Sequence, residues 1–202
     1  MVAVIDYGVG NLFSLLSSLK AIGADAVITN DVDTIKSADR IILPGVGAFE
    51  DAAKKLFESG LHEVIIEEVK NGKPLMGICL GMQLLFERSF EYGEHKGLGL
   101  IKGDILGFEG KIDKGLKIPQ IGWNALKLDK KDCPLWKYIK EGDYVYFVHS
   151  YFAALSDATA SSSEYGIEFT AAVSDGNIYG CQFHPEKSGD VGLNILRGFC
   201  EA

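Results

Sequence analysis

Cys79 stands at the junction of an apolar run and a helical pattern, with a glycine two residues to either side. The apolar run over residues 74–78 predicts a buried strand, and the spacing of leucines over 80–88 predicts a helix. So sharp a turn strains the backbone at its apex, and Gly77 and Gly81 leave room for it. The pattern is typical of a nucleophile elbow, with cysteine in the place of serine. A buried structural cysteine at a tight packing point is the alternative, and a partner base is needed to decide.

His184 is the candidate for that base. A β-rich run over residues 178–183 ends in His184, Pro185 and Glu186. An imidazole can take the proton of a thiol, and a carboxylate beside it can hold the imidazole in the required tautomer. Pro185 fixes a bend that lets both side chains turn toward one site. We therefore predict that Cys79, His184 and Glu186 form a catalytic triad.

Several segments carry a family resemblance. Residues 77–83 (GICLGMQ) and 184–186 (HPE) resemble the two signatures of the class I, or triad, glutamine amidotransferases. Within that class, the sequence is similar to the glutaminase subunits of imidazole glycerol phosphate synthase through DYGVGN at 6–11, PGVGAF at 44–49, IGWN at 121–124, VHSY at 148–151 and HPEKS at 184–188. These segments follow one another through nearly the whole chain, and the PGVG and GWN blocks are the ones that point to this subunit.

The resemblance implies an activity and a partner. Members of this family hydrolyse L-glutamine to glutamate and ammonia, and the ammonia passes to a cyclase subunit with a (β/α)8-barrel fold, in a heterodimer. The cyclase uses it to make imidazole glycerol phosphate and an aminoimidazole carboxamide ribotide in histidine biosynthesis. We expect the same activity here, with no cofactor.

The glycines that follow the apolar run at 40–43 have a possible role of their own. Gly45 and Gly47 let backbone N–H groups approach a ligand closely, which suits an oxyanion hole, although an ordinary strand-to-helix loop is the alternative. The resemblance gives this loop the second oxyanion donor, beside the N–H of Leu80. Because glycines flank Val46, its peptide is free to rotate. We expect it to turn toward the oxyanion only when the partner and its nucleotide are bound, so that the isolated chain is nearly inactive.

The resemblance also implies the remaining site residues. The substrate-binding set is Gly45, Val46, Gly47, Leu80, Gln83, Glu91, His149, Ser150 and Tyr151, with Glu91 on the α-amino group of glutamine. From the sequence alone, Glu91 is only a solvated loop carboxylate. The positions expected at the partner interface are Asn11, Trp123, Tyr146 and Lys187, although Trp123 in a loop-like segment is also a candidate core anchor. The family usually has histidine where this chain has Gln120, which bears on partner contacts rather than on the chemistry.

Charge and cysteine content argue against several classes of function. A net charge of −8 and a pI near 5.0 argue against a surface for nucleic acid or anionic membrane. No uncharged apolar run approaches the ~20 residues that span a bilayer, and no basic region of a signal peptide is visible. Cysteines 79, 133, 181 and 200 form no C-x-x-C pair, so we expect neither a metal site nor a disulfide framework. A reactive free thiol at Cys79 fits the cytoplasm.

The order of patterns predicts one α/β domain over residues 1–202. We expect a three-layer, mostly parallel sheet flanked by helices, with an antiparallel, β-rich excursion in the second half. Strands at 2–5, 26–29 and 40–43 and helices within 11–21 and 48–70 make the first half, and β-rich runs at 103–108, 125–128, 144–148 and 168–173 make the excursion. Residues 158–163 are expected to form a flexible turn. Residues 187–202 are expected to form a closing helix with Leu193, Leu196 and Phe199 on one face.

Three other functions remain open at this point. A glutaminase that feeds another synthase, such as one for anthranilate or pyridoxal phosphate, is disfavoured by Met82 and by the segment 122–124. A cysteine peptidase or esterase on a similar elbow would need a different pocket, which titration with glutamine and with peptides distinguishes. A binding module without activity would need a broken triad, and this triad is complete.

Overall fold

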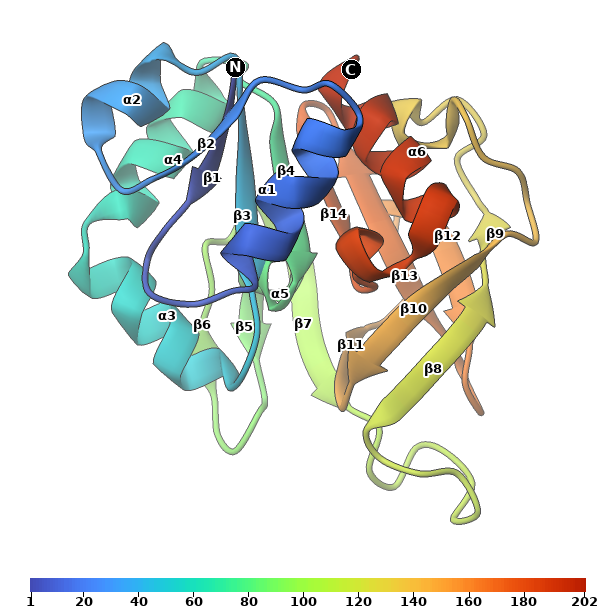
Figure 1. Ribbon diagram of the computed structural model, residues 1–202. Coiled ribbons are helices and arrows are strands. Elements are labelled where there is room, and N and C mark those ends of the chain that lie inside the picture. Colours follow the sequence, from blue (N-terminus) through green and yellow to red (C-terminus); the bar gives the residue numbers. More distant parts are fainter.

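The computed structural model describes residues 1–202 and is organised around one sheet of twelve strands (Figure 1). Five adjacent strands are parallel and form its first half. In spatial order they are β2 (Ala26–Thr29), β1 (Val2–Ile5), β3 (Arg40–Gly45), β4 (Leu75–Cys79) and β14 (Ile178–Cys181). Strands β1, β3 and β4 are buried almost throughout, which explains why they are continuous apolar runs.

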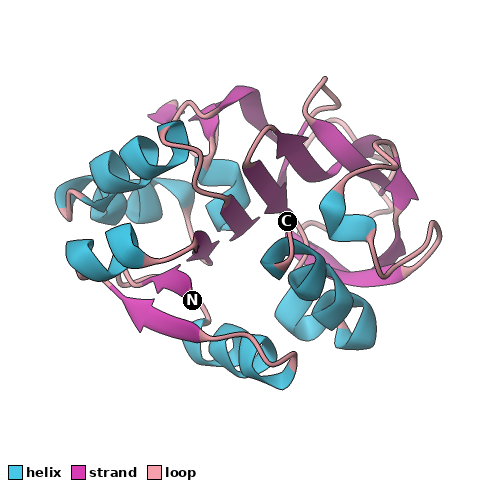
Figure 2. Ribbon diagram, turned by 90° about the horizontal axis from the view of Figure 1, so that it is seen from above, coloured by secondary structure: helices cyan, strands magenta, loops and turns pink.

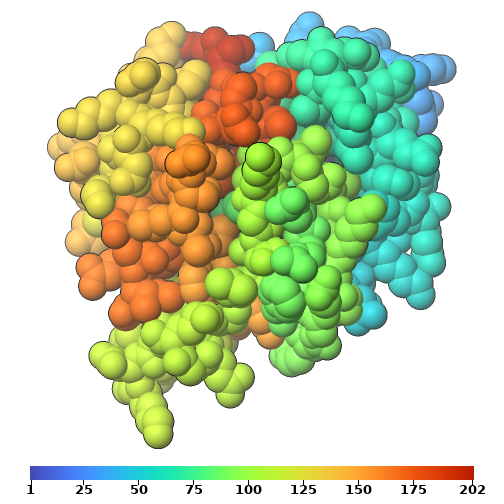
Figure 3. Space-filling model, turned by 180° about the vertical axis from the view of Figure 1, so that it is seen from behind, coloured from blue at the N-terminus to red at the C-terminus, as the bar shows by residue number.

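The remaining strands are mostly antiparallel and extend the sheet from β14. The path continues through β13 (Glu168–Asp175), β11 (Tyr151–Ala153), β7 (Ile101–Gly107), β5 (Phe86–Ser89) and β6 (His95–Lys96). Off this path, β12 (Thr159–Glu164) pairs with β13, and β9 (Lys127–Leu128) pairs with β12. Strands β8 (Gln120–Ala125) and β10 (Tyr144–His149) form a separate antiparallel pair. The segment between β7 and β8 projects from the body of the molecule (Figures 1 and 3).

Helices cover both faces of the parallel half (Figure 2). On one face, α1 (Leu12–Ala21) and α6 (Gly189–Cys200) share a buried apolar cluster with β1 and β4, together with the short 3-10 turn at Pro134–Trp136. On the other face, α2 (Val32–Ser37), α3 (Phe49–Glu58), α4 (Leu61–Lys70) and α5 (Leu80–Leu84) share a second cluster. The expected three-layer α/β class with an antiparallel second half is confirmed. None of the helices has the length and apolar character that crossing a membrane requires.

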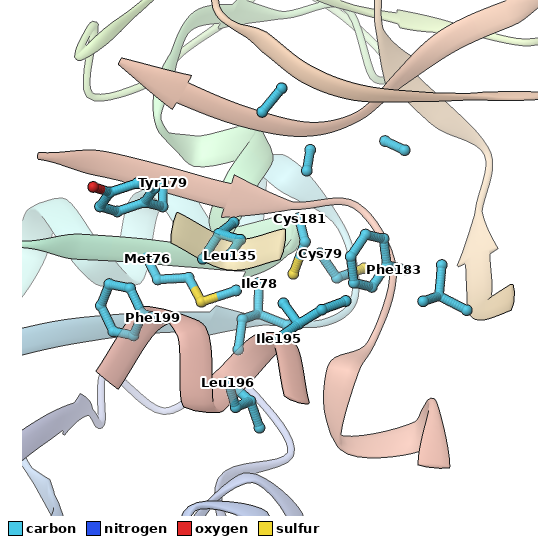
Figure 4. Close-up of a cluster of buried hydrophobic side chains, with 14 of the residues drawn as sticks. Met76, Ile78, Cys79, Leu135, Tyr179, Cys181, Phe183, Ile195, Leu196 and Phe199 are labelled. Carbon is cyan, nitrogen blue, oxygen red and sulfur yellow. The ribbon is translucent and has the colours of Figure 1, made fainter. Parts of the chain in front are cut away.

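Helix α6 supports the strand that carries the candidate nucleophile. Figure 4 shows Ile195, Leu196 and Phe199 of α6 against Met76 and Ile78 of β4, all in one buried cluster. The expected face of this helix needs one correction, because Ile195 is fully buried while Leu193 is only partly so. The helix also begins at Gly189, after a 3-10 turn at Pro185–Lys187.

The expectation of a flexible turn at 158–163 is wrong, because these residues form most of β12. Thr159 through Ser163 are all buried. Three of their four hydroxyl groups find partners, and that of Ser161 does not. Thr159 meets Thr170 Oγ1 at 2.8 Å, and Ser163 donates to the carbonyl of Ala125 at 2.9 Å. A polar strand can therefore be buried here, since hydrogen bonding offsets most of the cost of desolvating its hydroxyl groups.

Two local expectations are also wrong. The helix after Cys79 ends at Leu84 instead of reaching residue 88, because the carbonyl of Leu84 accepts from Leu98 N–H at 2.8 Å and β5 begins two residues later. Trp123 lies in strand β8 and not in a loop. Glu91 lies in the loop between β5 and β6, as expected.

Candidate active site

The candidate site lies where three adjacent parallel strands end. In the register of the sheet, Gly45 of β3 is opposite Cys79 of β4, and Ile78 of β4 is opposite Cys181 of β14. His184 follows β14 by three residues. Because carboxyl ends of parallel strands meet at one edge of a sheet, this topology brings the glycine loop, the cysteine and the histidine together from distant parts of the chain.

Cys79 has the backbone of a strained elbow. It adopts φ 54° and ψ −111°, which is rare for a residue other than glycine. The flanking glycines have no space for a side chain: a Cβ on Gly81 would overlap the carbonyl oxygen of Leu43, and one on Gly77 would lie 2.6 Å from the carbonyl oxygen of Gly81. The backbone itself therefore holds the turn, as the sequence predicts.

His184 connects Cys79 to Glu186. Its Nδ1 lies 2.8 Å from Glu186 Oε1, and the Cys79 sulfur is near enough to contribute to its pKa. Burial by itself would lower the pKa of His184, but hydrogen bonds to Cys79 and Glu186 and the charges of both outweigh burial and raise this pKa to about 9. A protonated imidazole between a sulfur and a buried carboxylate suits a group that must donate a proton.

A cavity of about 370 Å³ opens beside Cys79 and His184. Eight of the nine residues predicted for substrate binding line it, namely Val46, Gly47, Leu80, Gln83, Glu91, His149, Ser150 and Tyr151. Gly45 does not reach this cavity. It packs against the start of α5, where a Cβ would lie 2.7 Å from Gly81 N, so its role is to allow close approach of β3 to the elbow.

Two polar side chains of the cavity are held by backbone groups. Glu91 Oε2 accepts a hydrogen bond from Phe49 N–H, the first residue of α3, at 2.7 Å. Burial raises the pKa of Glu91, while that hydrogen bond and His95 oppose the rise. His149 Nδ1 lies 2.8 Å from the carbonyl oxygen of Tyr151, which can only accept, so Nδ1 carries the proton. Burial lowers the pKa of His149 to about 4, and the imidazole is neutral.

The four positions expected at a partner interface lie in three places. Trp123 and Tyr146 are neighbours across the β8–β10 pair, with ring centroids 5.9 Å apart, and Trp123 is 52% exposed. Lys187 lines the candidate cavity. Asn11 precedes α1, makes no side-chain capping bond, and lines a small hollow that Glu186 also reaches.

Two residues near Cys79 were not predicted. Tyr7 donates to the carbonyl oxygen of Pro44 at 2.7 Å, which fixes it behind the glycine loop. Burial is the main cause that raises the pKa of Tyr7, and the nearby Cys79 adds to the rise. Gln182 donates to the Cys79 sulfur at 3.8 Å. Its one signal in the sequence is that it is polar in the otherwise apolar run before His184. No group of three or more His, Cys, Asp or Glu side chains is arranged to hold a metal ion.

Comparison with known proteins identifies the family. The model of the class-I glutamine amidotransferase family matches residues 3–201. An imidazole glycerol phosphate synthase subunit HisH from Caldanaerobacter subterraneus subsp. tengcongensis is 52% identical, over 100% of this chain and 98% of its own. The subunit HisH from Wolinella succinogenes is 50% identical, over 100% and 99%.

Solved structures agree on the fold. A crystal structure of a glutamine amidotransferase superposes with a TM-score of 0.76 at 18% identity, over 100% of this chain and 98% of the other. The structure of PurLQS from Thermotoga maritima gives 0.73 at 21%, over 99% and 97%. The chain belongs to the class-I glutamine amidotransferases and, within them, to the HisH subunits of imidazole glycerol phosphate synthase.

Proposed function

We propose that this chain hydrolyses L-glutamine to glutamate and ammonia with Cys79, His184 and Glu186, and passes the ammonia to a cyclase subunit in histidine biosynthesis. The observation that carries the proposal is that Cys79 and His184 line one cavity together with the carboxylate Glu91, while His184 Nδ1 lies 2.8 Å from Glu186 Oε1. A cavity of that kind suits a substrate with a cationic α-amino group at one end and an amide at the other.

Acylation is the first half of the reaction. The Cys79 thiolate attacks the side-chain carbonyl carbon of glutamine, and the oxyanion is held by the N–H of Leu80 and by an N–H of the loop at 45–47. Leu80 begins α5, where N–H groups have no partner within the helix. His184 gives its proton to the amide nitrogen, the C–N bond breaks, and ammonia leaves a glutamyl thioester on Cys79.

Deacylation reverses the role of His184. The imidazole, now neutral, takes a proton from water, whose oxygen attacks the thioester carbon. The C–S bond breaks and leaves the Cys79 thiolate beside protonated His184, which restores the starting ion pair. The new carboxylic acid gives its proton to solvent and leaves as glutamate. Glu186 stays ionised throughout and holds the imidazole in the productive tautomer.

The proposed partner is a (β/α)8-barrel cyclase that forms a heterodimer with this chain in the cytoplasm. The supporting observation is the outer face of the β8–β10 pair, where Ile121, Trp123 and Tyr144 are 62%, 52% and 58% exposed. An exposed cluster of large apolar side chains is typical of a protein interface. Lys187, which lines the cavity, and Asn11, near Glu186, would connect this interface to the reaction.

The loop at 45–47 is the proposed switch. Val46 is 40% exposed at the cavity, and Gly47 has φ +94°, so the peptide between them has few contacts that hold it in one orientation. Loss of one oxyanion donor costs ~10²–10³ in rate, which is enough to silence the isolated chain without moving Cys79.

A three-arm assay tests the function and the partner together. Glutamine turnover is measured for the isolated chain, for the purified complex with the cyclase, and for that complex with its nucleotide substrate. We expect turnover to rise by at least ~10² in the last arm. Cys79→Ala in the same complex should abolish synthesis from glutamine while synthesis from ammonium salts continues. Equal turnover in all arms would contradict the switch, and glutamine-dependent synthesis by Cys79→Ala would contradict the chemistry.

A further inference from the structure

A chain of buried amide hydrogen bonds leads from the cavity wall to the back of the nucleophile. Gln83 Nε2 donates to the carbonyl oxygen of Tyr151 at 3.0 Å and to Gln182 Oε1 at 3.0 Å. Gln182 Nε2 donates to Cys79 Sγ at 3.8 Å. Gln182 is fully buried and Gln83 nearly so. The chain joins α5, β11 and the residue after β14, which are far apart in the sequence.

The direction of this chain is fixed by its first member. The carbonyl of Tyr151 can only accept, so the group of Gln83 that faces it must be the NH₂. The same NH₂ also faces Gln182, so Gln182 must present its oxygen to Gln83. The remaining end of Gln182, which faces the sulfur, is therefore the NH₂ group. The orientation of an isolated side-chain amide is ambiguous, because its nitrogen and oxygen look alike. Here the carbonyl of Tyr151 determines the orientation of Gln182 through the amide of Gln83.

We propose that Gln182 is a functional donor to the Cys79 thiolate and that Gln83 is the residue that orients it. The proposal rests on the proposed function, because it adds a donor to the same sulfur. A donor that faces a sulfur stabilises its anionic form over its neutral form, since a thiol is a weak acceptor. His184 must turn from the sulfur to protonate the amide nitrogen that leaves as ammonia, whereas Gln182 remains in place through the whole reaction.

The proposal also changes the role of Gln83. This residue lines the cavity, but both hydrogens of its amide are already donated inside the protein. Its Oε1 is the atom that remains for a substrate. The carbonyl of Tyr151 accepts from Gln83 and from His149 Nδ1, so one backbone group fixes the polarity of the amide chain and the tautomer of the histidine.

Alkylation of Cys79 tests the proposal independently of turnover. The rate of reaction with iodoacetamide is followed at the Cys79 peptide by mass spectrometry, as a function of pH, in the complex. Gln182→Met keeps the length of the side chain and removes the donor. We expect the pH at half-maximal reactivity to rise by about one unit, which is tenfold in thiolate fraction, and kcat for glutamine to fall about tenfold. Gln182→Glu, which places a carboxylate at the sulfur, should raise the midpoint further.

Two comparisons separate this role from a structural one. Gln83→Met should shift the midpoint in the same direction by less, because Gln182 keeps its donor but loses its orientation. Gln120→Met makes the same change at another buried glutamine, which donates to Asn124 and not to Cys79, and should leave the midpoint unchanged. If Gln182→Met is unstable, the pH dependence of Cys79 alkylation in Gln83→Met and Gln182→Glu tests the proposal instead.

The result that would overturn the proposal is a Cys79 midpoint in Gln182→Met and Gln182→Glu that equals that of the parent. A fall in melting temperature without a shift in midpoint would overturn it as well, since it would make Gln182 a packing residue. Neither result would affect the proposed function, which is tested separately by whether Cys79→Ala still uses glutamine.

Discussion

The two sides of the candidate site are built differently. The side that holds Cys79 is defined by backbone: β3 and β4 meet α5 so closely that Gly45, Gly77 and Gly81 have no room for a Cβ. The side that holds His184 is defined by side chains, through the Glu186 carboxylate and the buried amides behind the sulfur. The backbone of the first side tolerates no added side-chain atom, whereas the hydrogen bonds of the second side can be removed one at a time by substitution.

This difference predicts how each side responds to substitution. A change in the backbone side should remove the fold of the elbow and all activity at once, because overlap with backbone atoms cannot be relieved by a rotamer change. A change in the side-chain side should give graded losses of rate or of pH response in a folded protein. The predictions that follow are ordered by the size of the expected effect.

Gly81→Ala should be the most damaging single substitution in the site. Its Cβ would overlap the carbonyl oxygen of Leu43, so the elbow must unfold or move, and we expect a loss of more than about 4 kcal/mol in the free energy of unfolding. Urea denaturation measures it. Gly115→Ala, where no atom lies within 4 Å of the new Cβ, is the matched control and should be neutral. A Gly81→Ala protein as stable as the parent would contradict the backbone account.

His184→Ala and Glu186→Gln should both fold and should differ in rate. Removing the base in His184→Ala should lower kcat for glutamine in the complex by a factor of about 10⁴ or more. Removing the orienting carboxylate in Glu186→Gln should lower kcat by a factor about a hundred times smaller. Circular dichroism confirms that each variant is folded before its rate is compared. Equal losses, or a larger loss for Glu186→Gln, would remove Glu186 from the proposed role.

His149 and His184 should make opposite contributions to stability as pH changes. The pKa of His149 is lowered to about 4 in the folded state, below the unfolded value of ~6.5. The contribution of His149 to the free energy of unfolding is therefore present above pH 6.5 and is lost as the pH falls from 6.5 to 4. The complete loss is about 3 kcal/mol. His184, raised to about 9, contributes fully below pH 6.5 and loses that contribution between pH 6.5 and 9. His149→Gln should therefore reduce acid sensitivity, measured as urea midpoints at pH 7 and pH 4.5. An unchanged difference between these midpoints would contradict the prediction.

Trp123→Ala should leave the isolated chain nearly as stable as the parent. Trp123 is 52% exposed in the isolated chain, so its removal takes away only part of one side chain's buried surface. Association with the cyclase should weaken at least tenfold, because the same side chain is expected to be an anchor of the interface. Melting temperature and calorimetric titration measure the two effects. Tyr138→Ala removes another partly exposed aromatic, one that contacts Glu201 beside the C-terminus, and should not change association. A large fall in melting temperature with unchanged association would make Trp123 a core residue.

The first half of the fold could be predicted well because its signals are local. Strand β2 matches its expected bounds, and α3 and α4 fill the helical region expected at 48–70. Buried parallel strands are apolar along their whole length, and helices repeat their apolar residues, so both are visible in a short window.

The second half could not be predicted in the same way. Strand β12 is polar, and its burial depends on Thr170 and Ala125, which no local pattern reveals. The site divides similarly. Cys79 and His184 stand in recognisable local patterns, whereas Gln182 acts on a sulfur 103 residues away in the sequence. Such a role comes from the three-dimensional arrangement alone.

Identification of the acylated residue tests the central claim most directly. The complex is mixed with glutamine and the cyclase nucleotide, quenched in acid within one turnover, digested, and analysed by mass spectrometry for a glutamyl thioester. The proposed mechanism predicts the adduct on Cys79 and none on the other three cysteines, two of which are buried away from the cavity and one partly so. A glutamyl adduct on Cys133, Cys181 or Cys200, or turnover with no thioester on Cys79 at any quench time, would contradict it.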